Sequence, residues 1–174
     1  GHRVPLIARW PKGIKASQKT NALACLTDLY DTLREITGQK KIDQGGEDSF
    51  SLLPAFNGKP KTSRSTLISH SISGHFSIRQ GDWKLCLSAG SGGWSAPKEM
   101  EAKKQGLPPI QLFNLKQDKG ERNNLQAKNK AKVKELIQVL DIEVKKGRSS
   151  PGKPLPNDRE VSYLPRGFNI SKSN

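Results

Sequence analysis

The sequence predicts an α+β fold in which a small antiparallel sheet is packed with amphipathic helices. Residues 76–87 alternate apolar and polar side chains around a Gly-Asp pair, which is the pattern of a β-hairpin. Two other segments, residues 20–38 and 130–147, carry apolar side chains at helical spacing. Only 33% of the residues are hydrophobic, whereas glycine and proline contribute 16 and 11 residues. We therefore expect a loop-rich protein with a small core.

The first 40 residues predict one strand followed by one helix. The apolar run VPLIARW, residues 4–10, is typical of a strand that is buried on both faces. Thr20 or Asn21 can cap the helix that follows, and Gly38 can end it. The apolar stripe of this helix consists of Leu23, Leu26, Tyr30, Leu33 and Thr37.

Residues 41–59 are predicted to connect this region to a sheet. They include a short helix in SFSLLPAFNGK, because Pro54 suits a first turn and Gly58 can end the helix. The next strands are expected at residues 66–71, 76–80 and 83–87. Period-two alternation then separates the charged side chains from one apolar face. That face consists of Phe76, Ile78, Trp83, Leu85 and Leu87.

The C-terminal third predicts one more strand and a second amphipathic helix. The strand lies in IQLFNL, residues 110–115, and the helix runs from Lys130 to Lys146 and is ended by Gly147. Residues 60–147 would thus form one sheet-plus-helix subdomain. The tail, residues 148–174, is rich in proline and polar residues, and we expect it to wrap around the subdomain or to fray.

The charge of the chain allows two interpretations. Its 30 Lys and Arg residues exceed its 16 Asp and Glu residues, which gives a net charge of +14. This surplus is either a solvated surface or a surface for a polyanion such as an acidic polysaccharide. Acidic residues are mixed among the lysines, and aromatic residues are only 6% of the chain. The sequence therefore does not favour specific binding of nucleic acid.

Other classes of protein are also disfavoured. No apolar run is long enough to span a membrane, and the opening GHRVPLIARWPKG has no features of a signal peptide. We expect the chain to be a fragment of a longer protein. Its two cysteines, Cys25 and Cys86, stand among leucines and are expected to be buried free thiols.

Five segments in this order resemble a known enzyme family. They are GHRVPLIARWP, LACLTDLYDTLREITG, EDSFSLLPAFNGK, FSIRQGDWKL and LFNLKQDKGERNNL. Over residues 1–152 the chain resembles the C-terminal part of the formylglycine-dependent sulfatases, the arylsulfatase branch of the alkaline-phosphatase-like superfamily. The matched motif positions are Gly1, Arg3, Val4, Pro5, Trp10, Pro11, Thr27, Asp28, Leu29, Asp118, Gly120, Glu121, Asn124 and Leu125. The resemblance implies that residues 1–40 complete the α/β catalytic domain of a periplasmic or secreted hydrolase of sulfate esters.

The same resemblance implies that the catalytic groups lie outside this chain. The family nucleophile is a cysteine or serine in C/S-x-P-x-R, which is oxidised to formylglycine, and oxygen ligands hold calcium nearby. Neither cysteine fits that motif, and Ser149 is a near match with Lys153 in place of arginine. We therefore expect no catalytic residue, no metal ligand and no bound cofactor here. Calcium and formylglycine would belong to the full-length protein, and the missing N-terminal part would be the partner without which this chain is inactive.

Five residues are candidates for contact with a sulfate-ester substrate. His2 follows the glycine nearest to the missing catalytic segment, and His70, Ser71 and His75 lie at a predicted strand-end loop. Trp94 lies on a glycine-serine loop, where it could stack on a sugar ring. For each residue the alternative is a packing or surface role. The sequence does not select between aryl and carbohydrate sulfates, and the alternative function is a stand-alone, non-enzymatic basic module that binds sulfated or phosphorylated polymers.

Overall fold

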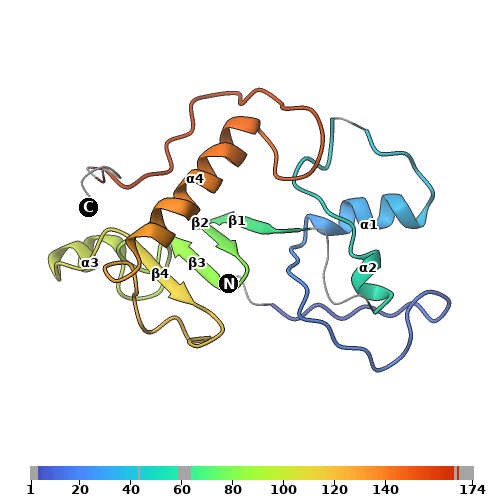
Figure 1. Cartoon of the computed structure of the whole chain (residues 1–174), viewed down its shortest axis with the longest axis horizontal. Helices are drawn as coiled ribbons and strands as arrows, with labels where there is room; N and C mark the ends of the chain where they lie inside the picture. Colours follow the sequence, from blue (N-terminus) through green and yellow to red (C-terminus); the bar gives the residue numbers. More distant parts are fainter. Residues whose placement is uncertain (1–3, 43, 59–63, 167, 169–174) are drawn as a thin grey trace. The chain divides into compact units, whose positions relative to one another are not determined.

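The computed structural model describes residues 4–42, 44–58, 64–166 and 168. The chain forms two compact units, residues 1–64 and 65–174, and each is described separately below (Figure 1). Among the described residues, the first unit contains two helices, and the second contains a sheet with two more helices. The predicted α+β class is confirmed by this element content.

The first unit is built around helix α1, Asp28–Ile36. The predicted helix was too long at its start, because Thr20 does not cap it. The Thr20 hydroxyl instead accepts a hydrogen bond from the amide of Ala22 in a local turn. The end was predicted correctly, since Gly38 adopts a φ of +70°. Helix α2, Leu53–Phe56, also forms where it was expected, with Pro54 in its first turn.

The polar face of α1 is the buried face, which reverses the orientation expected from its apolar stripe. Asp28, Asp31 and Thr32 are buried, whereas Leu26 and Leu33 are 69% and 59% exposed. The inversion has a physical cause. The Asp28 carboxylate and the Thr32 hydroxyl accept hydrogen bonds from the amides of Phe50 and Leu52, and the Asp31 amide donates to the Ser49 hydroxyl. These hydrogen bonds satisfy the buried polar groups and turn the apolar stripe outward.

The strand predicted across residues 4–10 is not formed. These residues lack strand structure and are exposed, Ile7 by 91%. A strand requires a hydrogen-bonded neighbour, and no strand lies among the described residues of this unit. The predicted strand is therefore absent from this structure, and its pairing within a longer protein stays a prediction.

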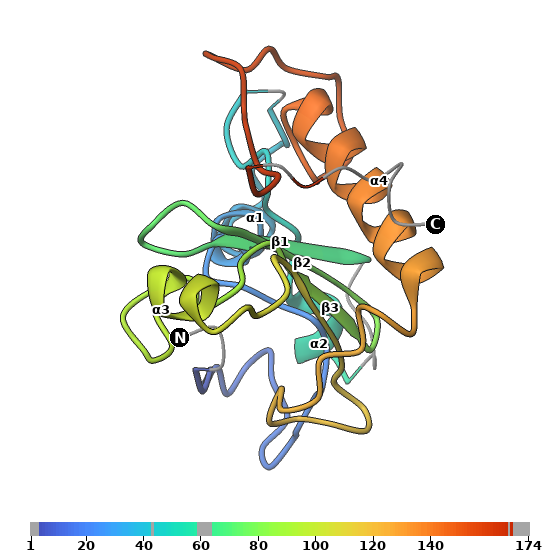
Figure 2. The same cartoon turned by 90° about the vertical axis from the view of Figure 1, so that its left-hand side faces the viewer.

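The second unit contains a four-stranded antiparallel meander. Its strands are β1 Thr66–His70, β2 Phe76–Gln80, β3 Trp83–Cys86 and β4 Gln111–Asn114, in the order β1-β2-β3-β4. These strands confirm the predicted hairpin region and the predicted last strand. Figure 2 shows the strands from the side, with helix α4, Lys130–Lys146, on one side of the sheet.

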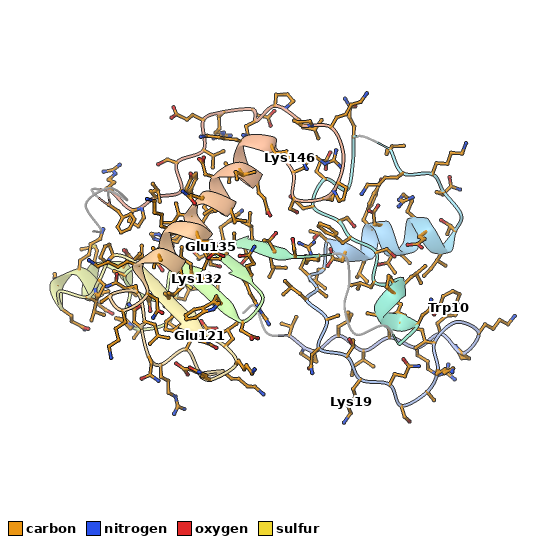
Figure 3. The ribbon with its side chains drawn as sticks, viewed as in Figure 1. Trp10, Lys19, Glu121, Lys132, Glu135 and Lys146 are labelled. Atoms are coloured by element: carbon orange, nitrogen blue, oxygen red, sulfur yellow. The ribbon has the colours of Figure 1, made fainter. Side chains whose placement is uncertain are left out.

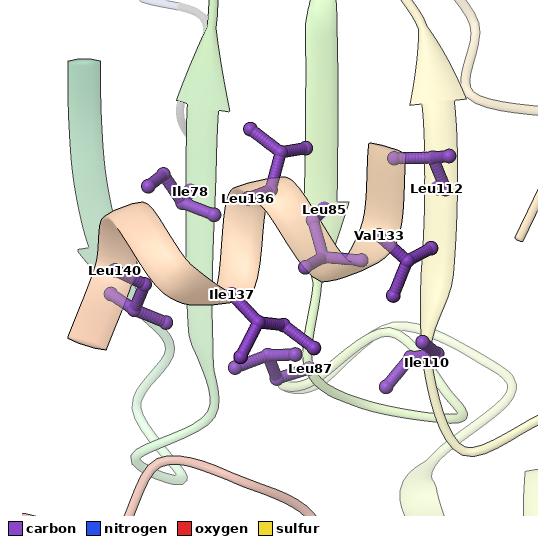
Figure 4. Packing of buried hydrophobic residues seen from close by; sticks show 9 residues of the cluster. All are labelled: Ile78, Leu85, Leu87, Ile110, Leu112, Val133, Leu136, Ile137 and Leu140. Carbon is purple, nitrogen blue, oxygen red and sulfur yellow. The ribbon is translucent and has the colours of Figure 1, made fainter. Parts of the chain in front are cut away.

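The core of this unit lies between α4 and one face of the sheet (Figure 4). In the sheet register, Ile78 pairs with Leu85 and Leu85 pairs with Leu112, so the three side chains form one row. Leu136 and Leu140 of α4 pack on this face and are fully buried. Burial of each such side chain contributes about 1.5–3 kcal/mol. Gly147 ends α4 with a φ of +67°, as predicted.

The tail wraps around the second unit as far as it is described. Arg148 is buried, and its guanidinium donates hydrogen bonds to the carbonyl groups of Ser150 and Lys153. Further along, the Tyr163 hydroxyl donates to Asp141 of α4 over 2.6 Å. Tyr163, Leu164 and Phe168 pack against the core. The tail therefore behaves as the wrapping alternative of the prediction.

Candidate substrate-contact surface

His70, Ser71 and His75 lie together at one end of the sheet, as predicted. The loop of residues 71–75 joins β1 to β2 and is closed by a hydrogen bond of 2.9 Å from the Ser71 amide to the His75 carbonyl. The Ser71 hydroxyl oxygen accepts from the amides of Ser73 and His75, both over 3.2 Å. Ser71 therefore shapes this loop with its acceptor oxygen, which is a structural role.

His70 is exposed at the end of β1 and packs against an aromatic neighbour at a tilted angle of 43°. It pairs in the sheet with Phe76, and the two ring centroids are 5.4 Å apart. Phe76 lies in turn 6.2 Å from the ring of Tyr163 in the tail. The contact with Phe76 covers one side of the His70 imidazole and leaves the rest of the ring accessible to solvent.

Trp94 lies on the loop of residues 87–98, which is anchored at both of its ends. The Gln111 side-chain amide donates to the carbonyl groups of Ser88 and Gly90, over 3.0 and 2.8 Å. The carboxylate of Glu99, at the start of helix α3 Glu99–Lys104, accepts from the Gly90 amide over 3.0 Å. Trp94 itself is 84% exposed. An ordered loop thus holds a solvent-exposed indole ring.

The two loops meet through glycines. A Cβ atom added at Gly92 would lie 3.6 Å from the Ser71 side chain, and one added at Gly93 would lie 4.0 Å from Ile72. Gly92 also has a φ of +72°, which favours glycine. Ile72 is 74% exposed, like Trp94 on the other loop. We refer to loops 71–75 and 87–98 together as the loop-pair surface.

The structure therefore brings four of the five candidate residues to this surface or its edge. His2 lies outside the described residues. Sequence reasoning missed Ile72, Glu99 and Gln111, because the roles of these residues depend on the contact between two loops that are distant in sequence. The alternation of Gly and Ser around Trp94 was the one available indication of a close approach.

A buried ion pair in the first unit was also missed. The Asp28 carboxylate accepts hydrogen bonds from the Cys25 and Phe50 amides, over 2.9 and 3.0 Å, and forms an ion pair with Arg64. Arg64 also lies 4.5 Å above the ring centroid of Phe50 and donates to the carbonyl group of Asp48. Together, these contacts hold residues 48–50 against α1. Asp28 is one of the positions that carry the resemblance described above, but that resemblance did not reveal its partner.

Ionisation in the second unit is perturbed at the contact between the tail and α4. Burial, followed by the hydrogen bond to Asp141, raises the pKa of Tyr163 to about 12. Hydrogen bonds from Lys145 and Tyr163 lower the pKa of Asp141. At Cys86, burial raises the pKa of the thiol to about 11, which disfavours a nucleophilic thiolate. Both cysteines are free, as predicted, but they are half-buried rather than buried.

The basic surface includes ion pairs that do not form a site. On α4, Lys132 lies 2.6 Å from Glu135 (Figure 3), and Lys145 lies 2.7 Å from Asp141. Exposed pairs of this kind contribute only about 0–1 kcal/mol. Within the described ranges, no three His, Cys, Asp or Glu side chains are grouped so that they could hold a metal ion. None of the described helices is long and apolar enough to cross a membrane.

Comparisons with known proteins identify sulfatases as relatives of this chain. No family model matches the chain. An N-acetylgalactosamine-6-O-sulfatase of Bacteroides thetaiotaomicron is 28% identical over 141 residues, which are 81% of this chain and 27% of that protein. Human steryl-sulfatase is 26% identical over 157 residues, which are 80% of this chain and 27% of that protein. A solved structure from work on glycosaminoglycan metabolism by Bacteroides thetaiotaomicron has a TM-score of 0.63 and 27% identity, and the match covers 77% of this chain and 27% of that one.

These findings confirm the resemblance noted in the sequence and favour the sulfatase interpretation over the stand-alone basic module. Both curated relatives are sulfatases, and the chain spans 27% of the length of each. The match to a solved structure extends the relationship from sequence to fold. The chain is therefore a homologue of sulfatases and corresponds to the C-terminal part of these proteins.

Proposed function

We propose that the chain is the C-terminal segment of an enzyme that hydrolyses sulfate esters, and that it supplies scaffold and cleft rim rather than the nucleophile. The observation that carries this proposal is the match to a sulfatase over 81% of the chain but only 27% of the relative. The sequence contains no C/S-x-P-x-R motif. On this proposal, the 174-residue chain alone is inactive.

The exposed apolar side chains of the first unit support a partner for this segment. On and beside α1, the exposed fractions are 69% at Leu26, 47% at Tyr30, 59% at Leu33 and 38% at Ile36. Exposed apolar patches of this kind are typical of interfaces between proteins or domains. The partner that we propose is the part of the sulfatases that this chain does not span, including the catalytic domain to which residues 4–10 would add a strand.

Two further features of the complete protein belong to this proposal. Formylglycine would supply the nucleophile and calcium would bind the sulfate group. Both would be held by the part of the longer protein that this chain does not span. A periplasmic or secreted location would follow from the family resemblance.

The activity is tested by comparing the 174-residue chain with the same protein extended to the length of its relatives. Release of sulfate is measured from N-acetylgalactosamine 6-sulfate and from a chromogenic aryl sulfate. We expect turnover by the extended protein on at least one substrate and none by the chain alone. An extended protein that binds sulfated glycans but releases no sulfate from any ester would overturn the proposal.

The proposed partner is tested with a paired substitution, Leu26→Ser with Leu33→Ser. Removal of exposed apolar area should make the isolated chain more soluble, whereas in the extended protein it should lower the melting temperature. A matched control is Ile142→Ser, because Ile142 is 64% exposed on α4 of the other unit. Equal effects of the two changes in the extended protein would contradict an interface on α1.

A further inference from the structure

We propose that the loop-pair surface is a saccharide-binding site in which Trp94 stacks on a pyranose ring of a sulfated glycan. The inference rests on the proposed function and assigns its substrate class. The loop-pair surface would bind the sugar ring, whereas the catalytic domain would bind the sulfate ester.

The first support is the accessibility of the Trp94 ring. The indole is 84% exposed, and the residues that flank it, Ser91–Gly93 and Ser95–Ala96, have side chains no larger than a hydroxymethyl group. Such small neighbours leave the ring faces open to a flat ligand. The apolar face of a pyranose, formed by its C–H bonds, has the size and shape to stack there, as sugars do on aromatic side chains in binding sites.

The second support is the rigidity of the loop. Gln111 and Glu99 hold the backbone at Ser88, Ala89 and Gly90. A backbone hydrogen bond of 2.9 Å from Ser91 to Pro97 then closes the loop around Trp94. A loop backbone that is already held in place loses less conformational entropy when a ligand binds.

The third support is the chemistry of the loop that approaches the loop of Trp94 at Gly92 and Gly93. The neighbouring loop contributes Ile72, which is 74% exposed, together with the polar residues Ser71 and His75. A sugar presents both an apolar ring face and hydroxyl groups, so it matches such a mixed surface better than a purely apolar ligand does. The net charge of +14 favours an anionic glycan over a neutral one.

The test compares Trp94→Ala and Trp94→Phe in the extended protein. With a 6-sulfated N-acetylhexosamine oligosaccharide, we expect Trp94→Ala to raise KM about tenfold, as loss of an aromatic anchor typically does. The value of kcat should change less than threefold, because the contact is equal in ground and transition states. Trp94→Phe should retain most of the affinity. A chromogenic aryl sulfate, which is too small to reach a second subsite, should show unchanged kinetics.

The matched control is Met100→Ala, since Met100 is 72% exposed on the neighbouring helix α3. It should leave KM for the oligosaccharide unchanged. An unchanged KM in Trp94→Ala, or an equal loss with the aryl sulfate, would overturn the saccharide site. Equal melting temperatures of Trp94→Ala and the parent protein would show that the change acts on binding, whereas a clear decrease would identify Trp94 as a packing residue and refute the inference.

A binding measurement separates this inference from the proposed function. Tryptophan fluorescence of the 174-residue chain is titrated with a sulfated oligosaccharide and with its desulfated form. We expect a change that disappears in Trp94→Phe and persists in Trp10→Phe. If the extended protein is inactive but this binding is seen, the proposed function fails and the saccharide site stands. If the enzyme is active but Trp94 does not respond, the function stands and the saccharide site fails.

Discussion

Substitution of Asp28 should unfold the first unit locally, because its carboxylate neutralises a buried arginine. Asp28 and Arg64 have 0% and 2% side-chain exposure, so Asp28→Asn removes the carboxylate of a buried ion pair. Loss of one partner of a buried ion pair typically costs about 3–5 kcal/mol. The new NH2 group of the asparagine is itself a donor and cannot accept from Arg64 and the Cys25 amide. A buried donor that loses its acceptor costs about 1–3 kcal/mol. These terms overlap, so we expect a loss of at least about 3 kcal/mol.

The assay is amide hydrogen exchange at Phe50, whose N–H donates to the Asp28 carboxylate over 3.0 Å. A loss of about 3 kcal/mol corresponds to exchange that is more than about 100-fold faster. Amides of β2 in the other unit should be unaffected. The control Glu35→Gln lies at the exposed end of the same helix and should leave Phe50 unchanged.

A second arm distinguishes the charge from the size of the side chains. The double variant Asp28→Leu with Arg64→Met should exchange more slowly at Phe50 than Asp28→Leu alone, because both charges of this pair are then removed together. Exchange at Phe50 within about threefold of the parent rate in Asp28→Asn would refute the reasoning.

Three other changes follow from the second unit. Leu136→Ala in the core should lower the free energy of unfolding in urea by about 2–5 kcal/mol. The control Ile142→Ala, on the exposed side of the same helix, should lower it little, and equal effects would refute the assigned core. Gly92→Ala should lower the stability of the protein by about 1–2 kcal/mol, because the φ of Gly92 is +72°. The control in thermal melts is Gly93→Ala, since a Cβ atom at Gly93 would meet its nearest neighbour only at 4.0 Å. The pKa of Tyr163 is raised to about 12, so its contribution to stability is present below pH ~10 and is lost as the pH rises toward 12. Tyr163→Phe should therefore lose less stability than the parent over that range, and parallel curves would contradict this assignment.

Elements with purely local determinants were predictable from the sequence. The β2–β3 hairpin needs only alternation and Gly81, which has a φ of +56°. Helix α4 needs only its apolar stripe and Gly147. In each case the same residues that carry the pattern also make the contacts, so local preference and tertiary packing agree.

Elements that depend on distant partners were not predictable. The start and orientation of α1 depend on Arg64 and on residues 48–52, which a helical stripe cannot reveal. Helix α3 is short and polar, and it is held in place by the carboxylate of Glu99 at the loop of Trp94. In the candidate site, the position of His70 followed from the strand pattern. The approach of Gly92 to Ser71 required the three-dimensional sheet register.

The order of the strands in the sheet has a consequence for how the second unit folds. Each strand pairs with the strand that precedes or follows it in the chain, so the closing loops are short between β1 and β3. Proteins whose contacts are local in sequence fold faster than those with distant pairings. The β1–β2–β3 meander can therefore form before β4 and α4 have emerged from the ribosome. Until α4 has been synthesised and packs on the sheet, the side chains of Ile78 and Leu85 are exposed to solvent. Aggregation is most probable in that interval of synthesis.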